Sequence, residues 1–79
     1  MTAAVDNGLV TEFAKGQYVE LYPTIPSSRG GSVRAGTRGI VQAVDPTRPE
    51  DDIYLVEFLA FERLTGEQAW LRAIDLFPA

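Results

Sequence analysis

The sequence predicts a small all-β domain, and three observations support this. Apolar and polar residues alternate in several short runs, of which residues 53–59 form the clearest. Proline and glycine separate these runs, as they do between strands. No window longer than about ten residues keeps the apolar spacing of a helix without a proline or glycine. Several short strands joined by turns are typical of a small antiparallel barrel, which leaves few exposed strand edges.

The length and composition indicate one domain. The chain has 79 residues, of which 46% are hydrophobic and 23% are charged, as in ordinary globular proteins. A domain of this size buries only about 60% of the surface that its unfolded chain exposes, so its stability margin is thin. We expect residues 1–12 to form a flexible N-terminal arm and residues 13–79 to form the barrel domain.

The first half contains two predicted strands and a long loop. Residues 17–22 alternate and are expected to form a strand that ends at Pro23. Residues 23–35 are rich in proline, serine and glycine and predict a long first loop without regular structure. A glycine turn then leads into a second strand at residues 38–45, which is closed by a proline.

The second half begins with a loop at residues 47–52, whose acids we interpret as a solvated charge run. Residues 53–59 predict the next strand. Its core face is expected to carry Tyr54, Val56 and Phe58, because Glu57 on the other face needs solvent. The acids of the loop are Glu50, Asp51 and Asp52.

A hairpin connection is expected at residues 61–66, followed by a fourth strand at residues 67–72. Trp70 lies at the centre of that strand and is expected to be at least partly buried, opposite Tyr54 or Phe58. Residues 73–76 suit a single helical turn, and residues 77–78 suit a last short strand. The main structural alternative is an amphipathic helix over residues 59–74, interrupted by a glycine.

The absence of two residue types excludes much chemistry. The chain has neither cysteine nor histidine, so disulfides, thiolate metal sites and the commonest general base are excluded. The glycine spacing of residues 31–36 resembles a phosphate-binding loop, but the lysine that such a loop requires is missing. We therefore expect no enzymatic activity, no cofactor and no metal.

Four short segments, taken together, resemble the SH3-like small barrels of bacteria. They are similar to an uncharacterised bacterial family with the pattern AGTxGxV…YxVEF and to photosystem I subunits of the PsaE type. The resemblance covers roughly residues 13–77 and implies five antiparallel strands, a long first loop and a helical turn before the last strand. Because Trp70 is the only tryptophan, the paired tryptophans of proline-binding SH3 domains are missing, and we expect no such binding. The segments are Gly16-x-Tyr18-Val19-x-Leu21, Gly36-Thr37-x-Gly39-x-Val41-x-x-Val44-Asp45, residues 54–58, and Ile74-Asp75-Leu76.

Charge is unevenly distributed along the chain and suggests a contact surface. The net charge is −4, yet residues 25–44 contain no acid and include Arg29, Arg34 and Arg38. Arginine side chains suit carboxylates and phosphates. Tyr22 adds a flat surface beside this loop, and Phe61 in the hairpin connection suggests an apolar contact. These five residues are the predicted partner-binding site.

We therefore expect a non-catalytic protein-interaction module, an accessory or regulatory subunit of a bacterial complex that binds another protein. One alternative is a KOW-like nucleic-acid module that uses the arginine loop, although the negative net charge disfavours it. A second alternative is a subunit that supports the active site of a redox or hydratase enzyme. No segment resembles a secretory signal or a membrane span, so a cytoplasmic location is expected.

Overall fold

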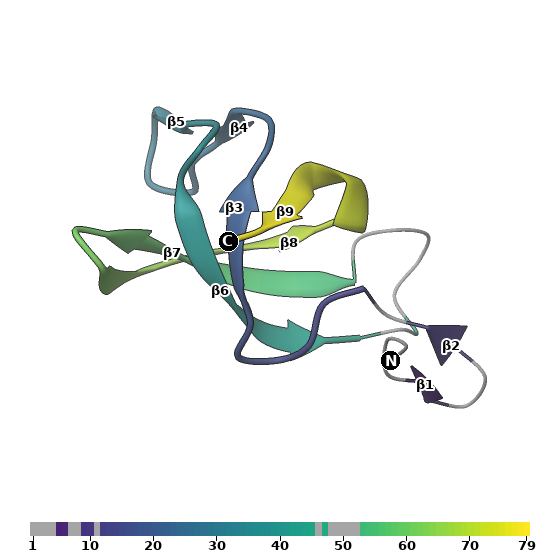
Figure 1. The fold of residues 1–79 in the computed structure, drawn as a ribbon. Coiled ribbons are helices and arrows are strands. Elements are labelled where there is room, and N and C mark those ends of the chain that lie inside the picture. Colours follow the sequence, from purple (N-terminus) through teal and green to yellow (C-terminus); the bar gives the residue numbers. More distant parts are fainter. Residues whose placement is uncertain (1–4, 7–8, 11, 46, 48–52) are drawn as a thin grey trace.

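The computed structural model describes residues 5–6, 9–10, 12–45, 47 and 53–79 (Figure 1). Nearly all regular structure in these residues is β-strand, with one 3₁₀ turn near the C-terminus. The elements, in chain order, are β1 (Val5–Asp6), β2 (Leu9–Val10), β3 (Tyr18–Leu21), β4 (Ile25–Pro26), β5 (Ser32–Val33), β6 (Arg38–Val44), β7 (Tyr54–Ala60), β8 (Arg63–Leu71), η1 (Ala73–Asp75) and β9 (Leu76–Pro78).

Five strands form one antiparallel sheet in the order β8-β7-β6-β3-β9. The last strand thus returns to lie beside the first strand of the sheet, and the sheet bends strongly in Figure 1. This arrangement confirms the predicted small all-β fold with five strands, a long first loop and a helical turn before the last strand. The helix proposed as an alternative over residues 59–74 is absent, because β8 occupies most of that range.

Two smaller sheets complete the fold. β1 pairs with β2 inside the segment expected to be an N-terminal arm. β4 pairs with β5 inside the long first loop, so this loop contains a short hairpin where no regular structure was expected. The predicted acidic run at residues 50–52 lies outside the described residues.

The β7–β8 connection is shorter than predicted. Ala60 pairs with Arg63, so the turn has only two residues, Phe61 and Glu62. Their φ angles are 51° and 63°, as in the type I′ turn that matches the twist of a two-residue hairpin. The expected connection over residues 61–66 is therefore wrong. Gly66, taken as its end, instead lies within β8 at an irregularity of the ladder.

The core lies on one face of the bent sheet. The predicted inward face of β7 is confirmed, because its three alternating residues Tyr54, Val56 and Phe58 are all buried. These three residues belong to a cluster of nine buried apolar residues among those that the structure describes; its other members are Phe13, Val19, Leu21, Val41, Leu71 and Leu76. Burying a large apolar side chain contributes roughly 1.5–3 kcal/mol, so this cluster supplies the main stabilisation of the folded state.

Trp70 lies on the opposite face from the one predicted. It pairs across the ladder with Leu55, whereas Tyr54 pairs with Leu71. Since successive side chains of a strand alternate between faces, Leu71 enters the core and Trp70 lies outside it, half-buried. The expected pairing with Tyr54 or Phe58 is therefore wrong. The expected partial burial is confirmed.

Gly39 permits the close approach of β6 and β7. A Cβ atom there would lie 2.6 Å from Val56 Cγ1 and 2.9 Å from the carbonyl oxygen of Glu57. Because a backbone carbonyl in a ladder cannot move aside cheaply, only glycine fits this position.

The chain before β3 is held by the Tyr54 hydroxyl. This oxygen accepts hydrogen bonds from the backbone N–H groups of Glu12 (2.8 Å) and Phe13 (3.4 Å). The Phe13 ring packs edge-on against Tyr54, with 5.3 Å between ring centroids. Phe13 therefore belongs to the core. Within the described part of the chain, no helix has the length and hydropathy needed to cross a membrane.

Candidate protein-binding site

The β4–β5 hairpin, residues 25–33, folds back on itself through a short turn. The backbone N–H of Ser27 donates to the carbonyl of Gly31 at 3.1 Å, and that of Gly30 donates to the carbonyl of Ser27 at 3.2 Å. Gly30 and Gly31 both have positive φ angles, which glycine adopts without steric cost. The serine and glycine residues that predicted an irregular loop therefore build a defined turn.

Glu67 on β8 holds this turn against the main sheet. Its carboxylate accepts hydrogen bonds from the Ser27 hydroxyl (2.8 Å), the Ser28 backbone N–H (2.8 Å) and the Ser28 hydroxyl (2.9 Å). The bond from Ser27, followed by those from Ser28 and the charge of Arg29, lowers the pKa of Glu67 below its usual value. Both carboxylate oxygens are therefore engaged within the chain.

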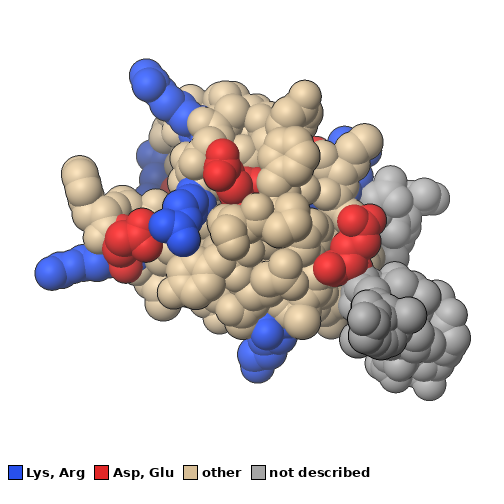
Figure 2. Space-filling view, viewed as in Figure 1, with Lys and Arg blue, Asp and Glu red and all other residues tan. Residues whose placement is uncertain are grey.

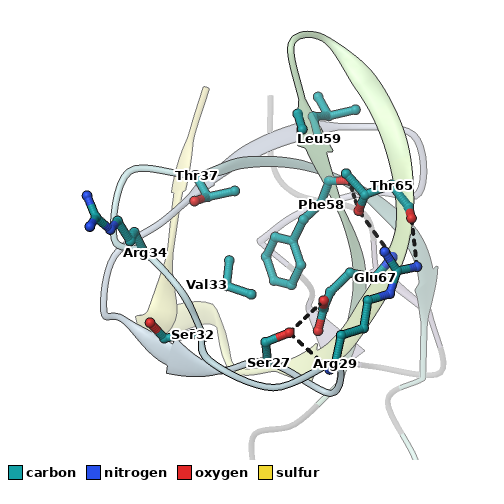
Figure 3. Close-up of a pocket in the computed structure, with 11 residues that line it drawn as sticks. Ser27, Arg29, Ser32, Val33, Arg34, Thr37, Phe58, Leu59, Thr65 and Glu67 are labelled. Carbon is teal, nitrogen blue, oxygen red and sulfur yellow. Dashed lines mark hydrogen bonds between the residues drawn. The ribbon is translucent and has the colours of Figure 1, made fainter.

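Arg29 makes a second link between the β4–β5 hairpin and the β7–β8 hairpin. Its Nη2 donates to the carbonyl oxygen of Thr65 at 2.8 Å (Figure 3). Gly66 follows with a φ of +82°, and a Cβ there would lie 2.9 Å from the same Nη2 atom. Gly66 thus allows both the backbone turn and the close approach of the guanidinium.

A groove opens between the β4–β5 hairpin and the β7–β8 hairpin, with a volume of about 410 Å³. Phe58 and Val33 point into it from opposite sides in Figure 3, and Phe58, only 3% exposed, forms part of its floor. Arg34 lies at its rim and points away from its centre. The groove is lined by Ser27, Arg29, Ser32, Val33, Arg34, Thr37, Phe58, Leu59, Ala60, Thr65 and Glu67.

The three predicted arginines have different surroundings. Arg29 is bonded to the β7–β8 hairpin, as described. Arg38 forms an ion pair with Glu62 at 2.9 Å and lies over the Tyr18 ring, 5.5 Å from its centroid. Arg34 is exposed, and its guanidinium has no hydrogen-bond or ion-pair partner among the described residues. The structure therefore leaves one of the three free for a ligand.

Phe61 lies at the tip of the β7–β8 hairpin and is 99% exposed. A bulky residue with a φ of +51° is unusual, because its Cβ crowds the backbone in the left-handed region. Its neighbour Leu64 is 53% exposed and extends the apolar surface of the tip. The other turn residue, Glu62, forms the ion pair with Arg38.

Tyr22 belongs to a different part of the surface. Its ring packs edge-on against Phe77 of β9, with 5.1 Å between centroids, and its backbone N–H donates to the Asp75 carbonyl at 2.7 Å. Ile74 on η1 is 72% exposed. In Figure 1 the β7–β8 turn lies at the far left, whereas η1, in yellow, lies right of centre.

The structure thus divides the five predicted site residues among three places. Arg29 and Arg34 line the groove, Arg38 and Phe61 belong to the neighbouring hairpin tip, and Tyr22 lies beside β9. Glu67 was not predicted, because its hydrogen-bond partners lie about 40 positions away and no local pattern indicates them. On the face seen in Figure 2, basic and acidic side chains are interspersed and form no continuous basic patch.

Comparisons of the chain with protein-family models, curated proteins and solved structures gave no match. The resemblance to SH3-like barrels therefore stays a prediction from the quoted motifs. Among the described residues, no three histidine, cysteine, aspartate or glutamate side chains lie together in a way that could hold a metal ion.

Proposed function

We propose that this protein is a non-catalytic protein-interaction module that acts as a small accessory or regulatory subunit of a larger complex. Its contact surface is the tip of the β7–β8 hairpin together with the rim of the adjacent groove. The observation that carries the proposal is Phe61, which is almost fully exposed in a left-handed backbone conformation.

An exposed phenylalanine at this position is unfavourable for the isolated domain. Left-handed backbone costs a non-glycine residue roughly 1–2 kcal/mol, and the exposed ring recovers nothing by burial. Asparagine or glycine is the usual choice in such a turn. Aromatic residues in the centre of an interface, by contrast, often dominate the binding free energy. Insertion of Phe61 into an apolar pocket of a partner would account for both its exposure and its unfavourable backbone conformation.

Two contacts between the β7–β8 hairpin and neighbouring segments support this interpretation. Arg38 bonds to Glu62 in the turn, and Arg29 bonds to Thr65 three residues further along. They restrict the motion of the tip before any partner arrives, which lowers the entropy lost on binding. The same two bonds engage two of the three arginines expected to contact nucleic acid, so the arrangement favours a protein partner.

The test is affinity purification of the tagged chain from the organism that encodes it. Wild-type chain should recover a partner in stoichiometric amount, and Phe61→Asn should lose it. Ile74→Asn is the matched control, because it also removes an exposed apolar side chain, 72% exposed, away from the β7–β8 turn. Failure to recover any stoichiometric partner, or equal recovery by wild type and Phe61→Asn, would overturn the proposal.

A further inference from the structure

We propose that the groove between the β4–β5 and β7–β8 hairpins binds an extended segment of a partner protein in which an apolar side chain is followed or preceded by a carboxylate. The apolar side chain enters the groove over Phe58, and the carboxylate binds Arg34 at the rim. This inference rests on the proposed function and specifies the chemistry of the partner.

The groove has the right form for one apolar side chain. Val33 and Phe58 face each other across it, whereas the Leu59 side chain, on the other face of β7, points away from its centre. Ala60 also lines the groove. Val33 packs against the core and is held by its pairing with Ile25, so the groove wall is part of the folded structure. The other seven lining residues are polar or charged. A concavity that combines apolar side chains with polar groups is typical of ligand sites.

The charges of the groove favour a carboxylate. Its one acid, Glu67, already accepts three hydrogen bonds from Ser27 and Ser28 and has Arg29 nearby. Arg34 is therefore the charge left for a ligand, and residues 25–44 bring no acid that would repel a carboxylate. Ser32 and Thr37 also line the groove, and no hydrogen bond of either hydroxyl is found among the described residues.

The number of unpaired charges in the groove favours a peptide as the ligand over a polyanion such as a nucleic acid. Nucleic acids bind through several phosphates at once, each met by its own cation. Of the two arginines that line the groove, Arg34 is the one without a partner among the described residues, and the chain as a whole carries a net charge of −4. A single carboxylate fits one free arginine, while an apolar side chain supplies most of the affinity by burial.

The test begins with selection of a library of short random peptides on the wild-type chain. Enrichment of peptides that carry an aspartate or glutamate next to a large apolar residue is expected. In NMR titrations, an enriched peptide should shift the backbone amides of residues 27–37 and 58–65. Replacing its acid by the matching amide should weaken binding about fivefold, the effect of one exposed ion pair.

Arg34→Gln should weaken the same peptide about fivefold, whereas Lys15→Gln should not. Lys15 is the matched control, because it is exposed, loses the same charge and precedes β3 at the other end from the groove. Failure to enrich any peptide, enrichment without an acid, or equal binding by wild type and Arg34→Gln would each overturn the inference. If Phe61→Asn still abolishes partner recovery in any of these cases, the proposed function stands and only the groove ligand is wrong.

Discussion

Replacing Phe61 by asparagine should stabilise the domain, although it removes a large apolar side chain. Phe61 is 99% exposed, so its loss sacrifices almost no buried surface. Its φ of +51° costs a bulky residue roughly 1–2 kcal/mol, and asparagine tolerates this conformation better than other non-glycine residues. We therefore expect Phe61→Asn to raise the free energy of unfolding by about 1 kcal/mol.

The change is large enough to measure in a domain of this size. A gain of about 1 kcal/mol corresponds to a rise in Tm of roughly 4–8 °C for 60–100 residues. Urea unfolding followed by Trp70 fluorescence would give the free energy, since Trp70 is half-buried on β8 and becomes exposed on unfolding. Circular dichroism against temperature would give Tm independently.

Phe77→Asn provides the contrast. Phe77 is 52% exposed, has no positive φ and packs edge-on against Tyr22, so its replacement should destabilise the domain. If Phe61→Asn lowers stability as Phe77→Asn does, the reasoning about the turn is refuted. If it stabilises the domain and also abolishes partner recovery, Phe61 serves binding at the expense of stability.

Three further outcomes test the fold and the groove. Gly39→Ala should lower the free energy of unfolding in urea by about 3 kcal/mol, because a Cβ there meets backbone at 2.9 Å; a loss within about 0.5 kcal/mol would contradict this. Tyr54→Phe should cost about 1 kcal/mol and speed amide exchange at Glu12, whose N–H loses its acceptor; unchanged exchange would argue against that bond. Because the pKa of Glu67 is lowered on folding, its contribution is present above its unfolded pKa and is lost as pH falls through the folded value. The Ser28 amide signal should therefore move in NMR spectra of the wild type at a pH below the usual pKa of a glutamate; a similar shift in Glu67→Gln would show another cause.

The strands and the core face of this domain could be predicted from local pattern. The alternating pattern correctly predicts that Tyr54, Val56 and Phe58 are buried, because the side chains of a strand alternate between its two faces. The register of β8 was not predicted, since the two-residue turn contains Phe61 and Glu62 in place of asparagine and glycine. This error assigned Trp70 to the wrong face.

For the site, the amino-acid order was enough to indicate an arginine-rich loop and an apolar hairpin. It could not say which arginine is available. That depends on partners distant in the chain: Thr65 engages Arg29, Glu62 engages Arg38, and the described residues offer Arg34 no such partner. A hydrogen bond forms only between groups that folding brings within about 3 Å, so the free charge and the groove beside it exist only in the folded chain.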